Sequence, residues 1–318
     1  MSWPPESSPL TVLDLSQAPS RPAGDGTVVV GLDREGSLPP VEAYLFDTLV
    51  TVAPDPPAPW VGVDPRRLDA QVSQLGRAVA QNPIAATLLT RLLRLNASLS
   101  FDDALIVESL AYSSLLGGAE FHRWLAARAD MNADATGTQA VRYERQDDEV
   151  TLTFDAPETR NAITAVMRDA LYEALVNVVE DPSLPAVTLR GTGRCFSTGG
   201  YLPEFGSARD LASAHAIRTS RNSARLLRCL GKRARVKLHG ACIGSGIEIA
   251  AAASVRIGTS DTFVQLPELS MGLIAGAGGT VTLPRAIGRH RTAWLALSGV
   301  RVGASQALAW GLIHAIEP

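Results

Sequence analysis

Residues 238–279 constrain the fold more than any other stretch, because glycine-rich turns alternate there with strand-like and helix-like patterns. An apolar strand ending at Leu238 runs into the turn 240–246, and the alanine-rich run 249–253 predicts a helix. Glycine lets the backbone pass close to a ligand, and the opening turn of a helix leaves N–H groups free to donate. The stretch therefore predicts a strand–turn–helix unit with free amides at its bend.

Two glutamates accompany these turns. Glu248 falls at the start of the predicted helix, where the helix dipole favours a carboxylate. Glu268 follows Pro267 and precedes a second glycine-rich loop, GLIAGAGG. Taken alone, Glu248 is more simply explained as an acid at a helix start, and Glu268 as a residue of a surface turn. Together, beside free N–H groups, they can polarise a carbonyl and move protons next to it, which favours a general acid–base site.

Composition excludes several classes of protein. A 46% hydrophobic but only 5% aromatic chain suits an α/β core, and a net charge of −3 offers no broad basic field for nucleic acid or a membrane surface. Three cysteines are too few for a disulfide framework, which predicts a reducing, cytoplasmic location. No apolar run reaches the roughly 20 residues of a membrane span, and the first residues lack a signal pattern. Scattered histidines predict no metal site.

The order of patterns predicts five segments. They are a mobile tail at 1–25, an α/β segment of unknown role at 26–65, helices at 66–128, a linker at 129–139 and a core at 140–318. Ser100 and Asp103 resemble a helix-capping pair. In the core, strands alternate with helices, including a hairpin at 141–154 and a long helix around 211–230, which predicts parallel-sheet α/β architecture.

Three motifs, in this order and separation, resemble the crotonase (enoyl-CoA hydratase/isomerase) superfamily. They are APETRNAIT at 156–164, GRCFSTGGYLPEF at 193–205 and the stretch 238–279. The resemblance covers roughly residues 141–318. It implies a crotonase-like ββα spiral core, here with an additional N-terminal α/β and helical region. It also implies an acyl-CoA thioester as substrate, no cofactor beyond the coenzyme A of that substrate, and a homo-oligomer, either a trimer or a hexamer.

Residue roles follow from the same resemblance. The backbone amides of Gly200 and Ser245 match the oxyanion hole that holds the thioester oxygen. Glu248 and Glu268 match the two acids that position a water in the hydratases, with Glu268 protonating C2. Residues matching substrate-binding positions are Arg160, Asn161, Ala162, Ile163, Thr198, Tyr201, Leu202, Gly244 and Gly276.

The chain also departs from the family pattern. Tyr201 stands where an aspartate is common, and it either narrows the acyl pocket or is neutral; Ala275 replaces a frequent proline. In family members the segment that matches GLIHAIEP (residues 311–318) is followed by helices that cover the active site, whereas this sequence ends at that segment. Residues 81–94 and 98–128 resemble those helices, which predicts a permuted arrangement in which residues 66–128 supply the cover; an unrelated helical cap is the alternative.

Residues that would indicate other functions give weaker patterns. Ser245 lacks the spacing of a serine-hydrolase nucleophile, and His239 has no evident acid partner and is predicted to be buried. His215, Arg218 and Arg221 share a helix face that either meets coenzyme phosphates or faces solvent. An isomerase needs only one of the two acids. Other reactions of the superfamily (thioester hydrolysis, dehalogenation, decarboxylation, oxygenation) and a non-catalytic subunit that binds acyl-CoA or an acyl-carrier protein stay open.

Overall fold

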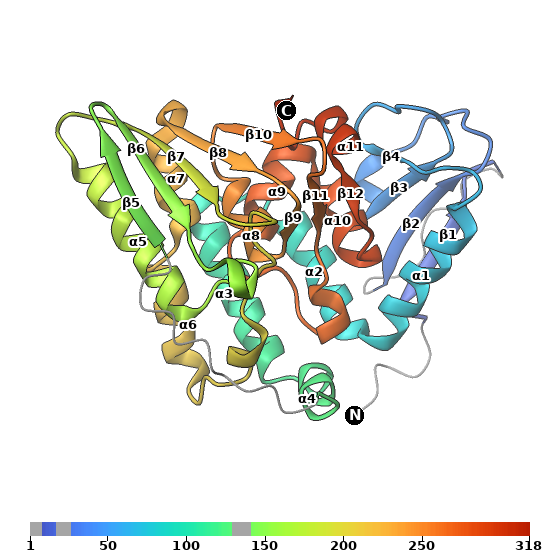
Figure 1. Ribbon diagram of the computed structural model, residues 1–318. Helices are drawn as coiled ribbons and strands as arrows, with labels where there is room; N and C mark the ends of the chain where they lie inside the picture. The colour runs from blue at the N-terminus through green and yellow to red at the C-terminus, as the bar shows by residue number, and fades with distance from the viewer. Residues whose placement is uncertain (1–7, 17–26, 129–140) are drawn as a thin grey trace.

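A computed structural model describes residues 8–16, 27–128 and 141–318 (Figure 1). Its largest sheet has six strands in the order β13-β10-β8-β7-β6-β5. The strands are β5 (Val141–Gln146), β6 (Glu149–Phe154), β7 (Ala186–Gly191), β8 (Ala234–Leu238), β10 (Val255–Thr259) and β13 (Ala315–Glu317). Only β5 and β6 pair antiparallel, as the predicted hairpin. The other neighbours are parallel, because helices connect them.

A second, three-stranded sheet contains β12 (Val302–Gly303), β11 (Phe263–Gln265) and β9 (Ala241–Ile243). Consecutive strands alternate between the two sheets: β8 and β10 belong to the large sheet, and β9 and β11, which directly follow them, belong to the small one. A helix follows each pair, α8 (Ser245–Ala250) after β9 and the short 3-10 helix Glu268–Met271 after β11. The predicted α/β fold with a ββα spiral core is thereby confirmed.

Two helices of the core differ from the prediction. The helix expected over 211–230 is broken into α6 (Leu211–Ser220) and α7 (Ser223–Leu230), because the side chain of Asn222 caps α7 by accepting a hydrogen bond from the Arg225 amide. The helix expected at 249–253 begins earlier, at Ser245, and ends at Ala250. The Arg256 guanidinium donates to the Ala251 and Ala253 carbonyls, which turns the alanine run away from the helix.

The remaining core helices complete the spiral. They are α5 (Ala165–Glu180), α9 (Gly279–Ile287), α10 (Arg289–Ser298) and α11 (Ala304–Ala309). Figure 1 shows α5, α6 and α7 on the side of the hairpin β5–β6, and α10 and α11 toward the N-terminal strands.

The N-terminal strands form a separate parallel sheet in sequence order. These strands are β1 (Leu10–Asp14), β2 (Val28–Asp33), β3 (Thr48–Thr51) and β4 (Trp60–Gly62). Residues 10–14 were expected in a mobile tail but pair with β2; the rest of that tail, apart from 8–16, lies outside the described residues. Among the described residues before Leu68 the only helical element is the 3-10 turn Ala43–Leu45, so this segment is built from strands rather than being α/β.

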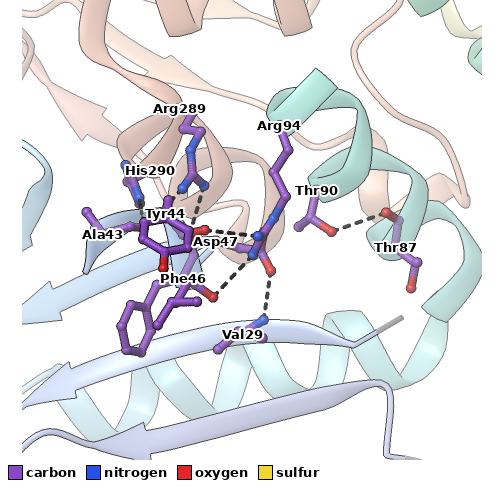
Figure 2. A network of polar contacts seen from close by, with 11 residues as sticks. Val29, Ala43, Tyr44, Phe46, Asp47, Thr87, Thr90, Arg94, Arg289 and His290 are labelled. Carbon is purple, nitrogen blue, oxygen red and sulfur yellow. Dashed lines mark hydrogen bonds and ion pairs between the residues drawn. The ribbon is translucent and has the colours of Figure 1, made fainter. Parts of the chain in front are cut away.

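A polar network joins this sheet to the rest of the molecule (Figure 2). The buried Asp47 carboxylate accepts from the Val29 amide at 2.8 Å and from Arg94 Nε at 2.7 Å. Arg289 donates to the Phe46 and Ala43 carbonyls at 2.7 and 3.0 Å. Asp47 therefore connects a strand of the sheet to helix α2 (Pro83–Leu95), and Arg289 connects the same loop to α10.

Replacing Asp47 by alanine is expected to destabilise the protein by roughly 1–3 kcal/mol, because the buried Val29 amide loses the carboxylate to which it donates. Chemical denaturation of the purified variant measures the loss. The matched control is Asp69→Ala, whose carboxylate also lies 2.7 Å from an arginine but is well exposed, so its change stays below about 1 kcal/mol. Equal losses of unfolding free energy in the two variants would contradict the stabilising role of the buried Asp47 network.

Four helices cover the core on one side: α1 (Leu68–Gln81), α2 (Pro83–Leu95), α3 (Phe101–Leu116) and α4 (Ala119–Ala126). The predicted cap of α3 is confirmed, since Ser100 Oγ accepts from the Asp103 amide at 3.1 Å. Asn82 and Asn96 donate to the Leu269 and Thr280 carbonyls of the core at 2.8 and 2.9 Å. The apolar side chains of these helices belong to the same buried cluster as the core, so the helices form part of one hydrophobic interior. The linker predicted at 129–139 lies outside the described residues.

No helix in the described parts of the chain combines the length and apolar character needed to cross a bilayer.

Candidate active site

The loop that carries Gly200 is held against strand β9. The Ser197 amide donates to the Ala241 carbonyl at 3.1 Å, and the Ile243 amide donates to the Ser197 carbonyl at 3.0 Å. Gly199 has a φ of +87°, and a Cβ there would lie 2.7 Å from the Ile243 carbonyl oxygen. Close approach of two backbones therefore requires glycine at this point.

The two amides of the predicted oxyanion hole come from adjacent segments. Gly200 forms a bridge with Ile163, in which the Ile163 amide donates to Gly199 and the Tyr201 amide donates to Ile163. This pattern leaves the Gly200 amide itself unused by the bridge. Ser245 is the first residue of α8, where the helix supplies no acceptor for its amide. Both residues line the same cavity as Glu248 and Glu268.

We call this space, of about 200 Å³, the acid cavity. It is bordered by residues from the core and from α3 of the helical cover. The predicted site residues that line it are Ile163, Gly200, Ser245, Glu248, Glu268 and Gly276; Tyr112, Arg168, Arg218 and Arg221 are further members.

Glu248 is a buried carboxyl group at the start of α8. Its Oε2 accepts from the Ala277 amide at 2.6 Å and from the Gly279 amide at 3.0 Å. Burial raises the pKa of Glu248 to about 7, although these two amide donors act in the opposite direction. Near neutral pH this side chain is therefore able both to take up and to release a proton.

Glu268 is buried without a hydrogen-bond partner on its Oε2 among the described residues. Its Oε1 lies against Gly244, where a Cβ would approach to 2.5 Å. Burial, followed by repulsion from Glu248, raises the pKa of Glu268 well above its usual value. A buried acid that the protein leaves unpartnered, in a cavity, is suited to give its proton to a bound molecule.

A third buried acid, Glu108 of α3, was not found from the sequence. It accepts from the Gly278 amide at 2.7 Å, from the Thr280 amide at 2.8 Å and from Thr280 Oγ1 at 2.7 Å. The four consecutive amides of residues 277–280 thus alternate between Glu248 and Glu108. Burial and the neighbouring Glu248 raise the pKa of Glu108 to about 8. The available signal was an acid on the apolar face of a helix, next to the buried Ala104 and Leu105.

Several predicted binding residues lie outside the acid cavity. The Asn161 side chain is fully buried and bonded to backbone groups: its Nδ2 donates to Thr192 and Cys195 carbonyls and its Oδ1 accepts from Ala156. It shapes the loop, and its side chain is committed to the protein. Residues at binding positions that the structure also places outside the lining are Arg160, Ala162, Thr198, Leu202 and Gly244. Their roles stay predictions.

A second, larger space of about 730 Å³ lies between the cover and the loop after Gly200; we call it the side cavity. It is lined by α3, α4, residues 204–211 and α6, and it includes Tyr201. It shares Tyr112, Ile163 and Arg218 with the acid cavity, so the two spaces adjoin.

The helix face of His215, Arg218 and Arg221 does not face solvent throughout. His215 Nδ1 lies 2.9 Å from Ser109 Oγ of α3, and Arg218 Nη1 donates to the same oxygen at 2.8 Å. The cover packs on this face through polar side chains, which sequence periodicity alone did not indicate.

The serine-hydrolase arrangement is absent from the described residues. Ser245 Oγ is buried without a hydrogen-bond partner there, and His239 Nε2 lies 3.1 Å from the Gly193 carbonyl oxygen. His239 is half-buried rather than buried, because its ring sits at the edge of the turn. In the same parts of the chain no three histidine, cysteine or acidic side chains are grouped so as to hold a metal ion.

Comparison with known proteins gives a consistent result. A family model described as enoyl-CoA hydratase/isomerase matches residues 144–318. The chain is 32% identical over 179 residues to an enoyl-CoA isomerase/hydratase of Mycosarcoma maydis, covering 52% of this chain and 64% of that protein. It is 30% identical over 188 residues to the fatty acid oxidation complex subunit alpha of Shewanella sp. (strain W3-18-1), covering 55% of this chain and 26% of that protein. The chain thus spans less than two thirds of these curated relatives.

A solved structure is also similar. The enoyl-CoA hydratase from Thermoplasma volcanium GSS1 superposes with a TM-score of 0.51 at 33% sequence identity, covering 57% of this chain and 72% of that one. The similarity covers about the share of the chain that the core segment occupies.

Proposed function

Because this chain belongs to the enoyl-CoA hydratase/isomerase family, we propose that it adds water across the double bond of a 2-enoyl-CoA thioester. The observation that carries the proposal is that Glu248, Glu268 and the two residues of the predicted oxyanion hole, Gly200 and Ser245, line one cavity. An isomerase needs one acid, whereas holding and splitting a water molecule beside a double bond uses two. No cofactor beyond the coenzyme A of the substrate enters this reaction.

In the proposed mechanism the thioester oxygen accepts hydrogen bonds from the Gly200 and Ser245 amides. Negative charge develops on that oxygen when a nucleophile adds at C3, and each such donor lowers the barrier by roughly 3–4 kcal/mol. Glu248, held by its own two amide donors, orients the water and accepts one of its protons as the hydroxyl bonds to C3. Glu268 gives its proton to C2, and the proton that Glu248 took from the water returns to Glu268 before the next turnover, so one water is consumed in total.

Incubation with short, medium and aromatic 2-enoyl-CoAs tests the proposal. We expect 3-hydroxyacyl-CoA as the product, followed by loss of the enoyl absorbance and by mass spectrometry. Movement of the double bond without addition of water would favour the isomerase instead. Binding of every thioester without turnover would favour a non-catalytic subunit that binds acyl-CoA or an acyl-carrier protein.

The pKa values of the two acids predict a bell-shaped dependence of kcat/KM on pH. Activity is expected to rise through about pH 7, where Glu248 becomes the carboxylate that holds water, and to fall at higher pH as Glu268 loses its proton. Since the acids are neighbours, the two limbs report the pair rather than either residue alone. Initial rates in a series of overlapping buffers measure the profile, and a flat profile across this range would refute the division of roles.

Two further properties belong to the proposal. A cytoplasmic location is supported by the three cysteines, which are all free. Assembly into trimers or hexamers rests on membership of the family, and light scattering of the purified chain tests it.

A further inference from the structure

Arg218 lies at the junction of the acid cavity and the side cavity, and no carboxylate in the described part of the chain pairs with it. It extends from α6 and lines both spaces. Its Nη1 donates to the Ser109 carbonyl and to the hydroxyls of Ser109 and Ser113, at 2.8–3.2 Å. Among the described residues its Nε and Nη2 have no acceptor, and no ion pair forms. The N–H groups of Nε and Nη2, three of the five that a guanidinium carries, are therefore available to a bound molecule.

The other arginines of the acid cavity differ in this respect. Arg168 pairs with Asp169 at 2.8 Å, and Arg221 pairs with Glu173 at 3.2 Å and with Asp169 at 3.6 Å. These carboxylates neutralise both charges. Glu204, which also lines the cavity, uses its carboxylate to accept from the Ala165 amide. Arg218 is thus the one guanidinium of this cavity that forms no ion pair among the described residues, although Glu108 is near enough to favour its charge.

The surroundings of Arg218 are partly apolar. The guanidinium lies over the Tyr112 ring, 4.7 Å from its centroid, and Tyr112 in turn packs on Gly276 of the glycine-rich loop. Arg218 is half-buried, and a cation over an aromatic ring is stabilised by about 0.5–2 kcal/mol, so its charge is tolerated without an ion pair. Burial also lowers the pKa of Arg218. An anion from the ligand would supply the missing partner.

We infer that the acyl group of the substrate ends in a carboxylate and that Arg218 binds this carboxylate in a bidentate pair. The inference rests on the proposed function. Gly200 and Ser245 would then hold the thioester oxygen at one end of the acyl group, and Arg218 would hold the carboxylate at the other. A planar guanidinium with two free donor nitrogens matches a carboxylate in geometry as well as in charge. All three residues line the acid cavity, so the chain between the two ends lies in that cavity.

Saturated thioesters, which cannot react, test the inference without turnover. Glutaryl-CoA and valeryl-CoA have five-carbon acyl chains and differ in a terminal carboxylate or methyl group. By calorimetry, the wild-type protein is expected to bind glutaryl-CoA roughly 10- to 100-fold more tightly, the range for one charge-assisted pair. Arg218→Gln should reduce that ratio to near one. Arg221→Gln, which removes an already neutralised charge from the same cavity, should leave the ratio unchanged.

Coenzyme A alone distinguishes the acyl carboxylate from the phosphates of the coenzyme as the anion. If Arg218 bound a phosphate, Arg218→Gln would weaken coenzyme A, valeryl-CoA and glutaryl-CoA alike, which would overturn the inference. Equal binding of the two thioesters by the wild-type protein would overturn it as well, and this result needs no variant.

Turnover separates this inference from the proposed function. Glutaconyl-CoA and 2-pentenoyl-CoA are the matching unsaturated pair. Hydration of both at equal kcat/KM would support the proposed function and contradict the role of Arg218 as a carboxylate ligand. Tight, Arg218-dependent binding of glutaryl-CoA without hydration of either enoyl-CoA would support that role of Arg218 and contradict the proposed hydration.

Discussion

Replacing Glu268 by glutamine is expected to lower kcat for enoyl-CoA hydration by roughly 100- to 10,000-fold, the contribution of one positioned general acid. Glutamine has nearly the same shape but no acidic proton for C2. The Glu268 carboxyl has an unpartnered oxygen in the described structure, so the amide disrupts no observed bond there. Initial rates with a saturating enoyl-CoA measure kcat, and turnover that persists undiminished would remove Glu268 from the mechanism.

The same variant is expected to be at least as stable as the wild-type protein at pH 8. The pKa of Glu268 is raised in the folded state, so the folded protein holds this proton more tightly than the unfolded chain does. Stability from this group is present below the unfolded pKa and is lost as pH rises through the folded pKa. Glutamine stays neutral and escapes that loss. Thermal unfolding at pH 6 and pH 8 therefore shows a smaller pH effect in the variant.

A surface acid provides the control for this experiment. Glu149→Gln makes the same chemical change on the exposed hairpin, where the carboxylate lies 3.7 Å from Arg235. Its kcat is expected to stay within about twofold of the wild-type value, since an exposed pair contributes little. Loss of activity in Glu268→Gln with retained folding, set against this control, assigns the effect to the site rather than to net charge.

The sequence predicted the core of the site because its residues are close along the chain to backbone signals. Gly244 and Ser245 mark the turn from β9 into α8, and that turn places Glu248 in the first turn of the helix. The structure brings Gly200 into the same cavity, as the order of the motifs implied. Local patterns of glycine, strand and helix therefore carried most of the information on the core fold.

Glu108 and Arg218 were beyond this kind of reasoning. The partners of Glu108 are amides 170 and 172 positions away in sequence, so only tertiary packing brings them together. Arg218 was grouped with Arg221 by helix periodicity, yet Arg221 has acidic partners and Arg218 has none in the described structure. Periodicity gives the face of a helix. It does not give what packs on that face, which here is α3.

The first N-terminal strand was missed for a related reason. Residues 10–14 alternate too briefly to distinguish a strand from a tail, and β1 forms only by pairing with β2. The break at Asn222 has a local cause that could have been found, because asparagine before Ser223 is a good helix cap. Strand β1 thus depends on a tertiary partner, whereas the break between α6 and α7 depends on a local side-chain cap.

Removing residues 1–139 is expected to leave the remaining core insoluble or inactive. Buried side chains of the cover that share the core's hydrophobic cluster are Leu75, Val79, Leu89, Leu92, Leu93, Leu115 and Phe121. At about 1.5–3 kcal/mol for each side chain, their burial matches or exceeds the roughly 5–15 kcal/mol net stability of a domain. The amides of Gly278 and Thr280 would also lose Glu108 as acceptor, which frees the loop that holds Glu248.

Expression of residues 140–318 alone, followed by gel filtration and hydration assays, measures this loss. The matched arm supplies residues 1–139 as a separate chain in the same cells, which is expected to restore a soluble, active complex because the contacts are non-covalent. A full-length chain with a protease site inserted within 129–139 should keep its activity after cleavage for the same reason. A core fragment that is soluble and fully active by itself would show that these helices are a dispensable cap, and the proposed role of residues 66–128 as the cover of the site would then be wrong.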